Sequence, residues 1–210
     1  MAKRGSGDVA HDLLGSAHIF ASAVEEILEK RLLEESAGKQ LTLSQFRLLT
    51  MVAQTDARTI GDVALFLGVS NAAASKAVDK LVRRKLLHRA EGQPDRREIC
   101  LSLTEASRNL LATYAEKRES QLTHVFRDFS EDELRRTARL LDRLSAELVD
   151  HHSGPEEVCL QCGIYFRDHC VVRQLVKRNC FYLRNKSHPK LTHLVPGNGT
   201  SSEEPQGVES

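Results

Sequence analysis

The sequence has little that would indicate a membrane protein or a secreted protein. No apolar run approaches the roughly 18 residues of a membrane-spanning helix, and the first eight residues lack the apolar stretch of a signal peptide. Thirty Lys and Arg residues balance 29 Asp and Glu residues, so the net charge of +1 gives no overall basicity. These features predict a cytoplasmic protein in which any nucleic-acid surface must arise from local clustering of positive charge.

Motifs of common catalytic sites are also absent. The 210 residues contain no Gly-rich phosphate loop, no strand–helix–strand pattern, and no Ser, His and Asp or paired-carboxylate arrangement that spacing would assemble. We therefore predict that the protein is not an enzyme. Cys159-x-x-Cys162 alone is typical of a redox dithiol, so an iron–sulfur or thiol redox enzyme is the alternative from another class of protein.

Hydrophobic periodicity predicts a mainly α-helical chain. Apolar residues recur at helical spacing over 8–35, which indicates a long amphipathic first helix that ends near Gly38. Three further helices begin at capping boxes, in which a hydroxyl side chain pairs with an acidic or amide side chain three positions later. These boxes are Thr42–Gln45, Thr59–Asp62 and Ser130–Glu133.

A helix-turn-helix followed by a wing is predicted in the middle of the chain. Gly68–Ser70 forms a tight turn, and Ser70 caps a helix over 71–84 with a small, apolar inner face. Beyond it, alternating apolar and polar residues flank a Gly-Gln-Pro-Asp tip at 92–95, which indicates a β-hairpin. The expected fold class is mainly α: a winged helix-turn-helix with a two-stranded β wing and long N- and C-terminal dimerisation helices.

Such a motif places its second helix in the major groove of DNA, while the wing reaches the flanking backbone or the minor groove. We expect the contacts to come from the start of helix 71–84 and from the hairpin. The candidates are Ser70, Asn71, Ala73, Ser75, Lys76, Lys80, Arg89, Arg96 and Arg97. Asn71 and Lys76 can hydrogen-bond bases or phosphates, whereas alanines offer only apolar contacts, so phosphates should supply much of the affinity.

Two stretches carry a family resemblance. Leu41–Arg47 (LTLSQFR) and Asp95–Thr104 (DRREICLSLT) are similar to the second helix and to the Asp-x-Arg wing motif of the MarR family. The resemblance covers roughly residues 8–150. It implies a triangular homodimer that presents two recognition helices to a pseudopalindromic operator, with Asp95 and Arg97 bracing each wing.

The chain departs from the MarR pattern at two places in the recognition helix. Ala72–Ala74 replaces a stretch that is usually richer in Ser and Thr, and Lys85 stands where a Gly commonly ends the helix. The first departure leaves open which bases are read.

Four of the five cysteines lie beyond the resembling region, in a C-x2-C-x7-C-x9-C pattern. They are Cys159, Cys162, Cys170 and Cys180. Because a cytoplasmic chain keeps its thiols reduced, the cluster indicates a metal centre rather than disulfides. Four thiolates can bind a [4Fe–4S] cluster or a tetrahedral Zn²⁺ ion. Only one closely spaced pair is present, which favours the cluster; Cys162-Gly163 resembles a zinc knuckle, which keeps Zn²⁺ as the alternative, and buried cysteines without metal are a third interpretation.

These patterns predict a DNA-binding transcriptional regulator that acts as a homodimer on double-stranded DNA and uses the four-cysteine centre as a redox or iron–sulfur sensor. An alternative, implied by the resemblance, has a structural zinc and a small aromatic effector bound between the DNA-binding and dimerisation helices. The expected regions are an N-terminal dimerisation helix, a DNA-binding domain, C-terminal dimerisation helices, a cysteine-rich metal-binding segment and a disordered tail. Their bounds are 1–40, 41–104, 105–152, 153–190 and 191–210.

Overall fold

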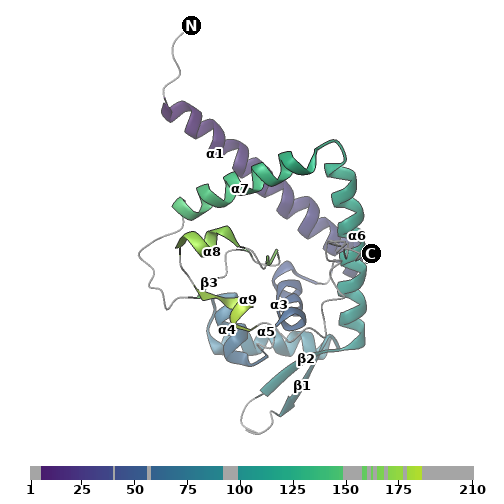
Figure 1. The fold of residues 1–210 in the computed structure, drawn as a ribbon. Coiled ribbons are helices and arrows are strands. Elements are labelled where there is room, and N and C mark those ends of the chain that lie inside the picture. Colours follow the sequence, from purple (N-terminus) through teal and green to yellow (C-terminus); the bar gives the residue numbers. More distant parts are fainter. Residues whose placement is uncertain are drawn as a thin grey trace, which may run out of the picture.

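The computed structural model describes most of the chain up to residue 185. The described residues are 6–39, 41–55, 58–91, 99–148, 158–159, 162, 165–167, 170–176 and 179–185. Long helices form an open frame, with the short helices from the middle of the chain and the β-hairpin at its base (Figure 1). The mainly helical class with a two-stranded wing is confirmed. No helix in the described part of the chain is long and apolar enough to cross a membrane.

The first helical run is continuous over the predicted range, but it is not uniform. It consists of α1 (Ser6–Ala23), a π-helical stretch η1 (Val24–Arg31) and α2 (Leu32–Ala37). The run ends at Gly38, whose φ of 69° lies in the left-handed region that glycine adopts without strain. Sequence periodicity missed the π-helical stretch because its wider turn shifts the phase of the pattern by only one residue.

The helix-turn-helix comprises α3 (Leu43–Gln54), α4 (Ile60–Leu67) and α5 (Asn71–Arg83). Each predicted N-cap is confirmed, because a hydroxyl group accepts a hydrogen bond from the backbone N–H three residues later. Between α4 and α5, Gly68 adopts a left-handed conformation with φ of 64°, which makes the tight turn possible.

The wing is an antiparallel hairpin of β1 (Leu87–Glu91) and β2 (Ile99–Leu103), with Leu87 opposite Leu103. Leu87 and Leu101 are fully buried against the helical core, as the alternation predicts. The predicted tip at 92–95 lies outside the described residues.

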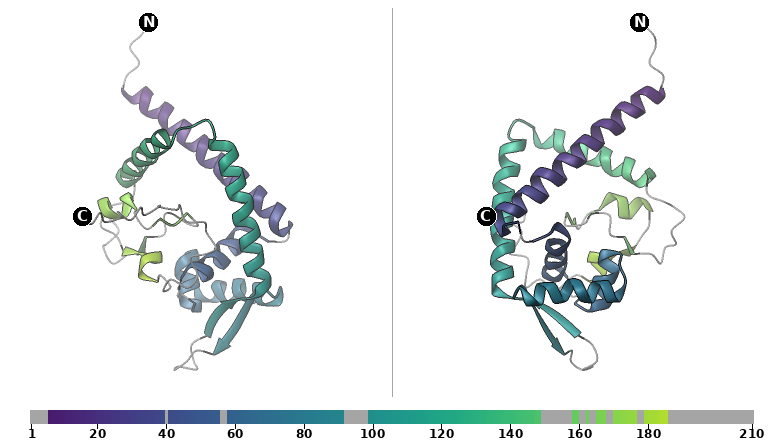
Figure 2. Two further views of the ribbon diagram at one scale, coloured as in Figure 1. Left: turned by 45° about the vertical axis from the view of Figure 1, so that its right-hand side comes forward. Right: turned by 180° about the vertical axis from the view of Figure 1, so that it is seen from behind.

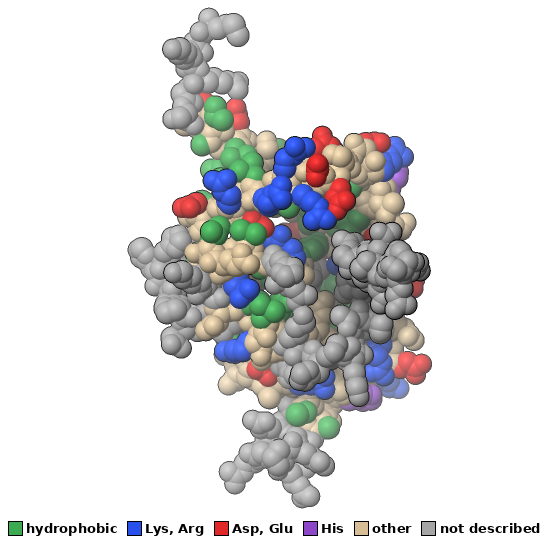
Figure 3. Space-filling model, in the orientation of Figure 1, with side chains coloured by type: hydrophobic (Ala, Val, Ile, Leu, Met, Phe, Trp, Pro, Cys, Tyr) green, Lys and Arg blue, Asp and Glu red, His purple; other side chains and the backbone are tan. Residues whose placement is uncertain are grey.

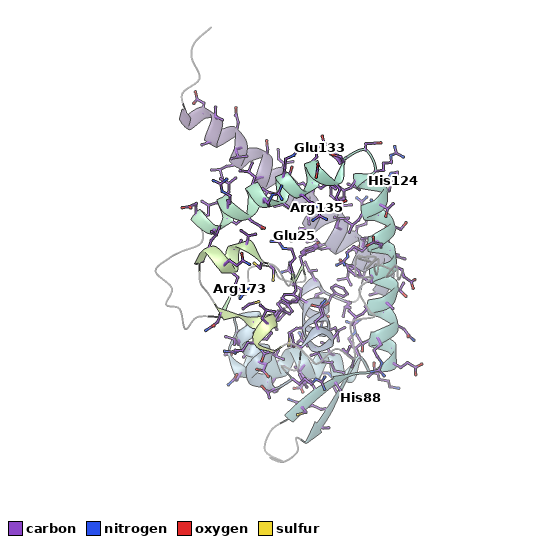
Figure 4. All side chains as sticks on the ribbon, viewed as in Figure 1. Glu25, His88, His124, Glu133, Arg135 and Arg173 are labelled. Atoms are coloured by element: carbon purple, nitrogen blue, oxygen red, sulfur yellow. The ribbon has the colours of Figure 1, made fainter. Side chains whose placement is uncertain are left out.

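Two long helices follow, α6 (Glu105–Phe126) and α7 (Glu131–Leu148). The predicted capping box between them is confirmed: Ser130 Oγ accepts from the Glu133 backbone N–H at 3.3 Å, and the Ser130 backbone N–H donates to the Glu133 carboxylate at 2.8 Å. These hydrogen bonds stabilise the ionised carboxyl group and hold the pKa of Glu133 below its ordinary value. Figure 4 labels Glu133 at this corner of the frame.

A buried aromatic pair joins the helix-turn-helix to the frame. The rings of Phe46 in α3 and Tyr114 in α6 lie 4.3 Å apart between centroids, and Tyr114 Oη donates a 2.8 Å hydrogen bond to the Leu28 carbonyl in η1. Burial raises the pKa of Tyr114 to about 12, so the phenol stays protonated and remains a donor. Three elements from different parts of the sequence are therefore fixed at one point.

The described parts of the cysteine-rich segment lie between α7 and α4, on the side of the frame opposite α6 (Figures 1 and 2). They form β3 (Val158–Cys159), α8 (Val171–Val176), β4 (Asn179–Cys180) and α9 (Phe181–Arg184), with β3 and β4 parallel. The sequence predicted a metal-binding segment here but not its packing onto the helices. The predicted tail, 191–210, lies outside the described residues.

Candidate nucleic-acid interface and cysteine-rich segment

The recognition helix α5 separates its buried and exposed faces sharply. Ala74, Val78 and Leu81 are completely buried, and they hold α5 against the hydrophobic core. The opposite face carries most of the predicted DNA-contacting residues of this helix. Those exposed to solvent are Ser70, Asn71, Ala73, Lys76 and Lys80. The helix is therefore anchored by small aliphatic residues and presents its polar N-terminal half outward, as insertion into a major groove requires.

Ser75 and Arg89, two further candidates, are engaged with each other in the DNA-free chain. Arg89 in β1 donates to the Asp79 carboxylate at 2.6 Å and to Ser75 Oγ at 3.2 Å. Asp79 and Ser75 lie one turn apart on α5, so the guanidinium group ties the wing to the recognition helix. Arg89 thus positions the wing in this state as well as presenting positive charge.

The remaining wing candidates, Arg96 and Arg97, lie outside the described residues, as does Asp95. Their predicted contacts with DNA and their bracing role stay predictions.

Lys85, just after the end of α5, adopts a backbone conformation that favours glycine. Its φ of 57° makes it the non-glycine residue with positive φ in the described chain. The Thr104 hydroxyl donates a 2.8 Å hydrogen bond to the Lys85 carbonyl, which fixes this turn at the start of the wing. A lysine in the left-handed conformation raises the free energy of the folded chain, whereas a glycine adopts this conformation without strain. Glycine therefore suits this position.

Three thiols of the cysteine-rich segment are described: Cys162, Cys170 and Cys180. The Cys170 Sγ accepts a 3.4 Å hydrogen bond from the Arg173 N–H, and α8 begins directly after this cysteine. Electrostatic effects of Cys162 and Cys180 help raise the pKa of Tyr182, after the larger effect of its burial. Cys162 and Cys170 likewise add to the rise in the pKa of Arg167, to which its hydrogen bond with Asp142 contributes most.

The strand pairing places the backbone of Cys159. Cys159 is the register partner of Cys180 in the parallel pair of β3 and β4, so the backbones of the first and last cysteines of the pattern lie side by side across the two strands. Cys162 and Cys180 are half-buried and pack against the core. Among the side chains that the structure describes, no group of three or more His, Cys, Asp or Glu is arranged to hold a metal ion. The side chain of Cys159 lies outside that set.

Comparison with known proteins agrees with this geometry. Residues 39–98 match the model of the MarR family. The similar curated proteins are named as HTH-type transcriptional regulators. Over 112 residues the chain is 25% identical to YpoP, an uncharacterized HTH-type transcriptional regulator of Bacillus subtilis, covering 53% of this chain and 79% of YpoP. YvnA, another such regulator of B. subtilis, is 29% identical over 100 residues, covering 46% of this chain and 64% of YvnA.

Solved structures show the same MarR-like fold. RV1404 from Mycobacterium tuberculosis superposes with a TM-score of 0.59 at 21% identity, over 71% of this chain and 99% of that protein. Streptococcus pneumoniae FabT, crystallised in complex with DNA, superposes with a TM-score of 0.57 at 19% identity, over 66% of this chain and 96% of FabT. Both curated relatives are named as uncharacterized HTH-type transcriptional regulators; that this chain is not an enzyme stays a prediction.

Sequence reasoning missed the contacts between the cysteine-rich segment and the MarR-like body. Asp142 and Phe66, which make these contacts, have no chemical motif around them. No signal in the sequence marked Asp142: it is buried together with Ala146, one turn later, whereas the leucines of α7 are half-buried or exposed. Only the structure shows that this carboxylate needs a cationic partner from elsewhere in the chain.

Proposed function

We propose that this protein is a homodimeric transcriptional regulator that binds a pseudopalindromic double-stranded DNA operator through α5 and the wing. The observation that carries the proposal is the division of α5, whose apolar face is fully buried while Asn71 and Lys76 are exposed. Side chains of these types hydrogen-bond bases and phosphates in the major groove. FabT, which superposes on this chain, was crystallised with DNA.

Homodimerisation would bury an apolar surface that is open in the single chain. Val9, Ile19 and Phe20 on α1 are more than half exposed, and Leu148 at the end of α7 is exposed as well. Figure 3 shows hydrophobic side chains at the surface of the outer turns of α1. Large exposed apolar residues on neighbouring helices are typical of an interface between subunits.

DNA binding is tested with duplexes that the purified protein selects from a random-sequence library. Asn71→Ala and Lys76→Ala should each weaken binding by about tenfold, the middle of the range for a major-groove or phosphate contact. Lys76→Ala should also reduce the salt dependence of binding by about one released counterion. Arg135→Ala is the matched control, because Arg135 lies on α7, far from the base of the frame (Figure 4). Failure to enrich any duplex, or equal loss in the control, contradicts the proposal.

We further propose that the four cysteines form a metal centre that modulates DNA binding, with a [4Fe–4S] cluster as the occupant and Zn²⁺ as the alternative. Support comes from the spacing of the four cysteines in the sequence and from the register pairing of Cys159 with Cys180. Four thiolates form a complete set of protein ligands for either a [4Fe–4S] cluster or a Zn²⁺ ion.

The occupant is identified by anaerobic purification, an ultraviolet–visible spectrum and analysis of iron, sulfide and zinc. A cluster should give broad absorption near 400 nm and about four iron and four sulfide per chain. A colourless protein with about one zinc per chain indicates the structural alternative. Cys162→Ala should lose either occupant, whereas Cys100→Ala, a change on the wing strand, should keep it. A wild-type protein without metal contradicts the metal centre but not the DNA-binding function.

The packing of Phe181 and Tyr182 against α4 weighs against the alternative in which a small aromatic effector binds between the helices. Phe181 and Tyr182 are fully buried beside Phe66 of α4, at centroid distances of 5.5 and 6.2 Å. The chain's own aromatic residues therefore cover part of α4. This observation favours regulation through the cysteine-rich segment.

A further inference from the structure

We infer that a strut from the cysteine-rich segment sets the spacing between the two DNA half-sites that the protein accepts. The strut is defined as Phe166–Arg167 together with Phe181–Tyr182, and it joins α4 of the helix-turn-helix to α7 of the frame through protein contacts alone. The inference rests on the proposed binding of a homodimer to a pseudopalindromic operator. It goes beyond that function because it assigns a determinant of operator specificity outside the recognition helix and the wing.

One end of the strut is an aromatic cluster on the helix-turn-helix. Phe181 and Tyr182 are fully buried, and their rings lie 5.5 and 6.2 Å from the Phe66 ring of α4 between centroids. The Phe166 ring stacks on Tyr182 at a centroid distance of 5.0 Å. Because α4 packs closely against α5, this cluster helps to fix the position of the helix that carries the proposed DNA-contacting residues.

The other end of the strut is an ion pair with α7. Arg167 donates a 2.6 Å hydrogen bond to the Asp142 carboxylate. Asp142 and Ala146 are the buried positions of α7, and α8 is the element against which α7 packs most extensively. A buried carboxylate needs a cationic partner, so this ion pair attaches the strut to α7 at a defined point.

The two ends of the strut meet in consecutive residues. Phe166 belongs to the aromatic cluster, and Arg167, the next residue, forms the ion pair with α7. Consecutive Cα atoms are about 3.8 Å apart across a trans peptide bond, so no length of loop separates the two contacts. A displacement of α4 relative to α7 that exceeds side-chain motion must therefore break the ring stacking or the ion pair.

The strut closes the frame on the side opposite α6. On the α6 side, the helix-turn-helix is attached through the ring contact of Phe46 with Tyr114 and through an ion pair between α3 and η1. Figures 1 and 2 show the cysteine-rich segment on the other side, between α7 and α4. A body held on one side can rotate about that attachment, whereas a second attachment across the frame opposes the rotation. The strut therefore fixes the orientation of α5 relative to the long helices.

In a homodimer, the orientation of α5 decides which spacing of half-sites fits. The recognition helices of such a dimer enter major grooves that are about 34–36 Å apart, one turn of B-DNA. One inserted base pair moves a half-site by about 3.4 Å and rotates it by about 34–36° about the DNA axis. If α5 is held rigidly, the DNA or the protein must distort to reach the displaced half-site, which lowers the affinity. A loosely held α5 would follow the half-site with a smaller loss.

The experiment compares duplexes that differ in spacing alone. A duplex selected by the wild-type protein from a random-sequence library supplies the two half-sites, and one base pair is inserted or removed at the centre of its symmetry. Affinity for each duplex is measured by fluorescence anisotropy with the full chain. The readout is the ratio of the affinities for the selected and the altered spacing, because a smaller amount of folded protein lowers both affinities equally and leaves their ratio unchanged.

Two variants release the strut at opposite ends. Phe66→Leu removes the ring of α4 from the aromatic cluster. Asp142→Ala removes the acceptor of Arg167, whose side chain is 46% exposed and can turn to solvent. Glu131→Gln is the matched control, because it breaks an exposed ion pair with Arg135 on the same helix as Asp142.

Wild type and Glu131→Gln should lose at least about tenfold in affinity for either altered spacing. The loss should fall below about threefold in Phe66→Leu and in Asp142→Ala, and both variants should still unfold cooperatively. The inference is overturned if the wild type binds the three spacings equally, or if either folded strut variant keeps the wild-type ratio. A wild type that selects no duplex, or only duplexes without two-fold symmetry, contradicts the proposed function itself, so the two failures are distinguishable.

Discussion

The Arg89 guanidinium group lies 2.6 Å from the Asp79 carboxylate, and this ion pair joins the wing to the recognition helix in the DNA-free chain. The pair is partly exposed, so its contribution to stability is small. Its position matters more, because it places a negative charge on a helix that is proposed to approach DNA phosphates.

Asp79→Asn should therefore strengthen DNA binding by about threefold to tenfold at low salt, since it removes one repulsive charge and frees Arg89 for a phosphate. The free energy of unfolding should change by less than about 1 kcal/mol. Anisotropy titrations over a range of salt concentrations measure the effect, with Glu131→Gln on α7 as the control. Weaker binding by Asp79→Asn would show instead that Arg89 must be held in place to read DNA.

Lys85→Gly should stabilise the protein. The left-handed conformation of Lys85 costs about 1–2 kcal/mol for a residue with a Cβ, and glycine avoids this cost. Part of the gain is offset, because glycine loses more conformational freedom on folding. We expect a net gain of about 0.5–1 kcal/mol in the free energy of unfolding, measured by denaturant titration. The same substitution at Lys80, inside α5, should cost about 1 kcal/mol. A loss of stability in Lys85→Gly would mean that the lysine side chain makes a compensating contact.

Arg47→Ala should destabilise the protein by about 2 kcal/mol, because it leaves the buried Glu29 carboxylate without its cationic partner. Combining it with Glu29→Gln should recover part of this loss, since a neutral amide needs no counter-charge. A double-mutant cycle in denaturant measures the interaction between the two residues. Additive effects of the two substitutions would contradict the pairing.

The capping box of α7 should make stability depend on pH. The pKa of Glu133 is held below its ordinary value of 4.5 in the folded chain, so its contribution is present above that pH and is lost as the pH falls through the folded pKa. Wild type should exceed Glu133→Gln in melting temperature at pH 7, and the difference should narrow below about pH 4.5. Glu131→Gln, in the same turn, controls for the effect of charge at the helix start. A difference that is constant with pH would contradict this cause.

Local signals in the sequence predicted most of the elements. Thr42, Thr59 and Ser70 each begin a helix because a hydroxyl group before an apolar repeat satisfies a backbone N–H, which is a short-range rule. The alternation at Leu101 and Leu103 predicted the wing strand for an equally local reason. The exposed face of α5, which is proposed to contact DNA, lies opposite the buried Ala74, Val78 and Leu81.

Long-range relationships were not predictable in the same way. The Arg167–Asp142 pair spans 25 positions, and contacts such as Phe66 with Phe181 join regions more than 100 positions apart. Neither depends on a local pattern, because a side chain's tertiary partner is set by how whole helices pack. The same reason explains why spacing predicted a cluster of cysteines but not the helices onto which it packs.

The π-helical stretch of the first helix has a geometric consequence. A π turn holds one more residue than an α turn, so η1 offsets the side-chain register of α1 from that of α2. If the same eight residues of η1 were wound as an α-helix, each would turn further about the axis, and the preceding 18 residues would rotate relative to α2. Val9 and Ile19 would then point in a different direction while Leu32 and Leu33 stayed in the core. The direction of the exposed apolar stripe is thus set by the π winding of η1.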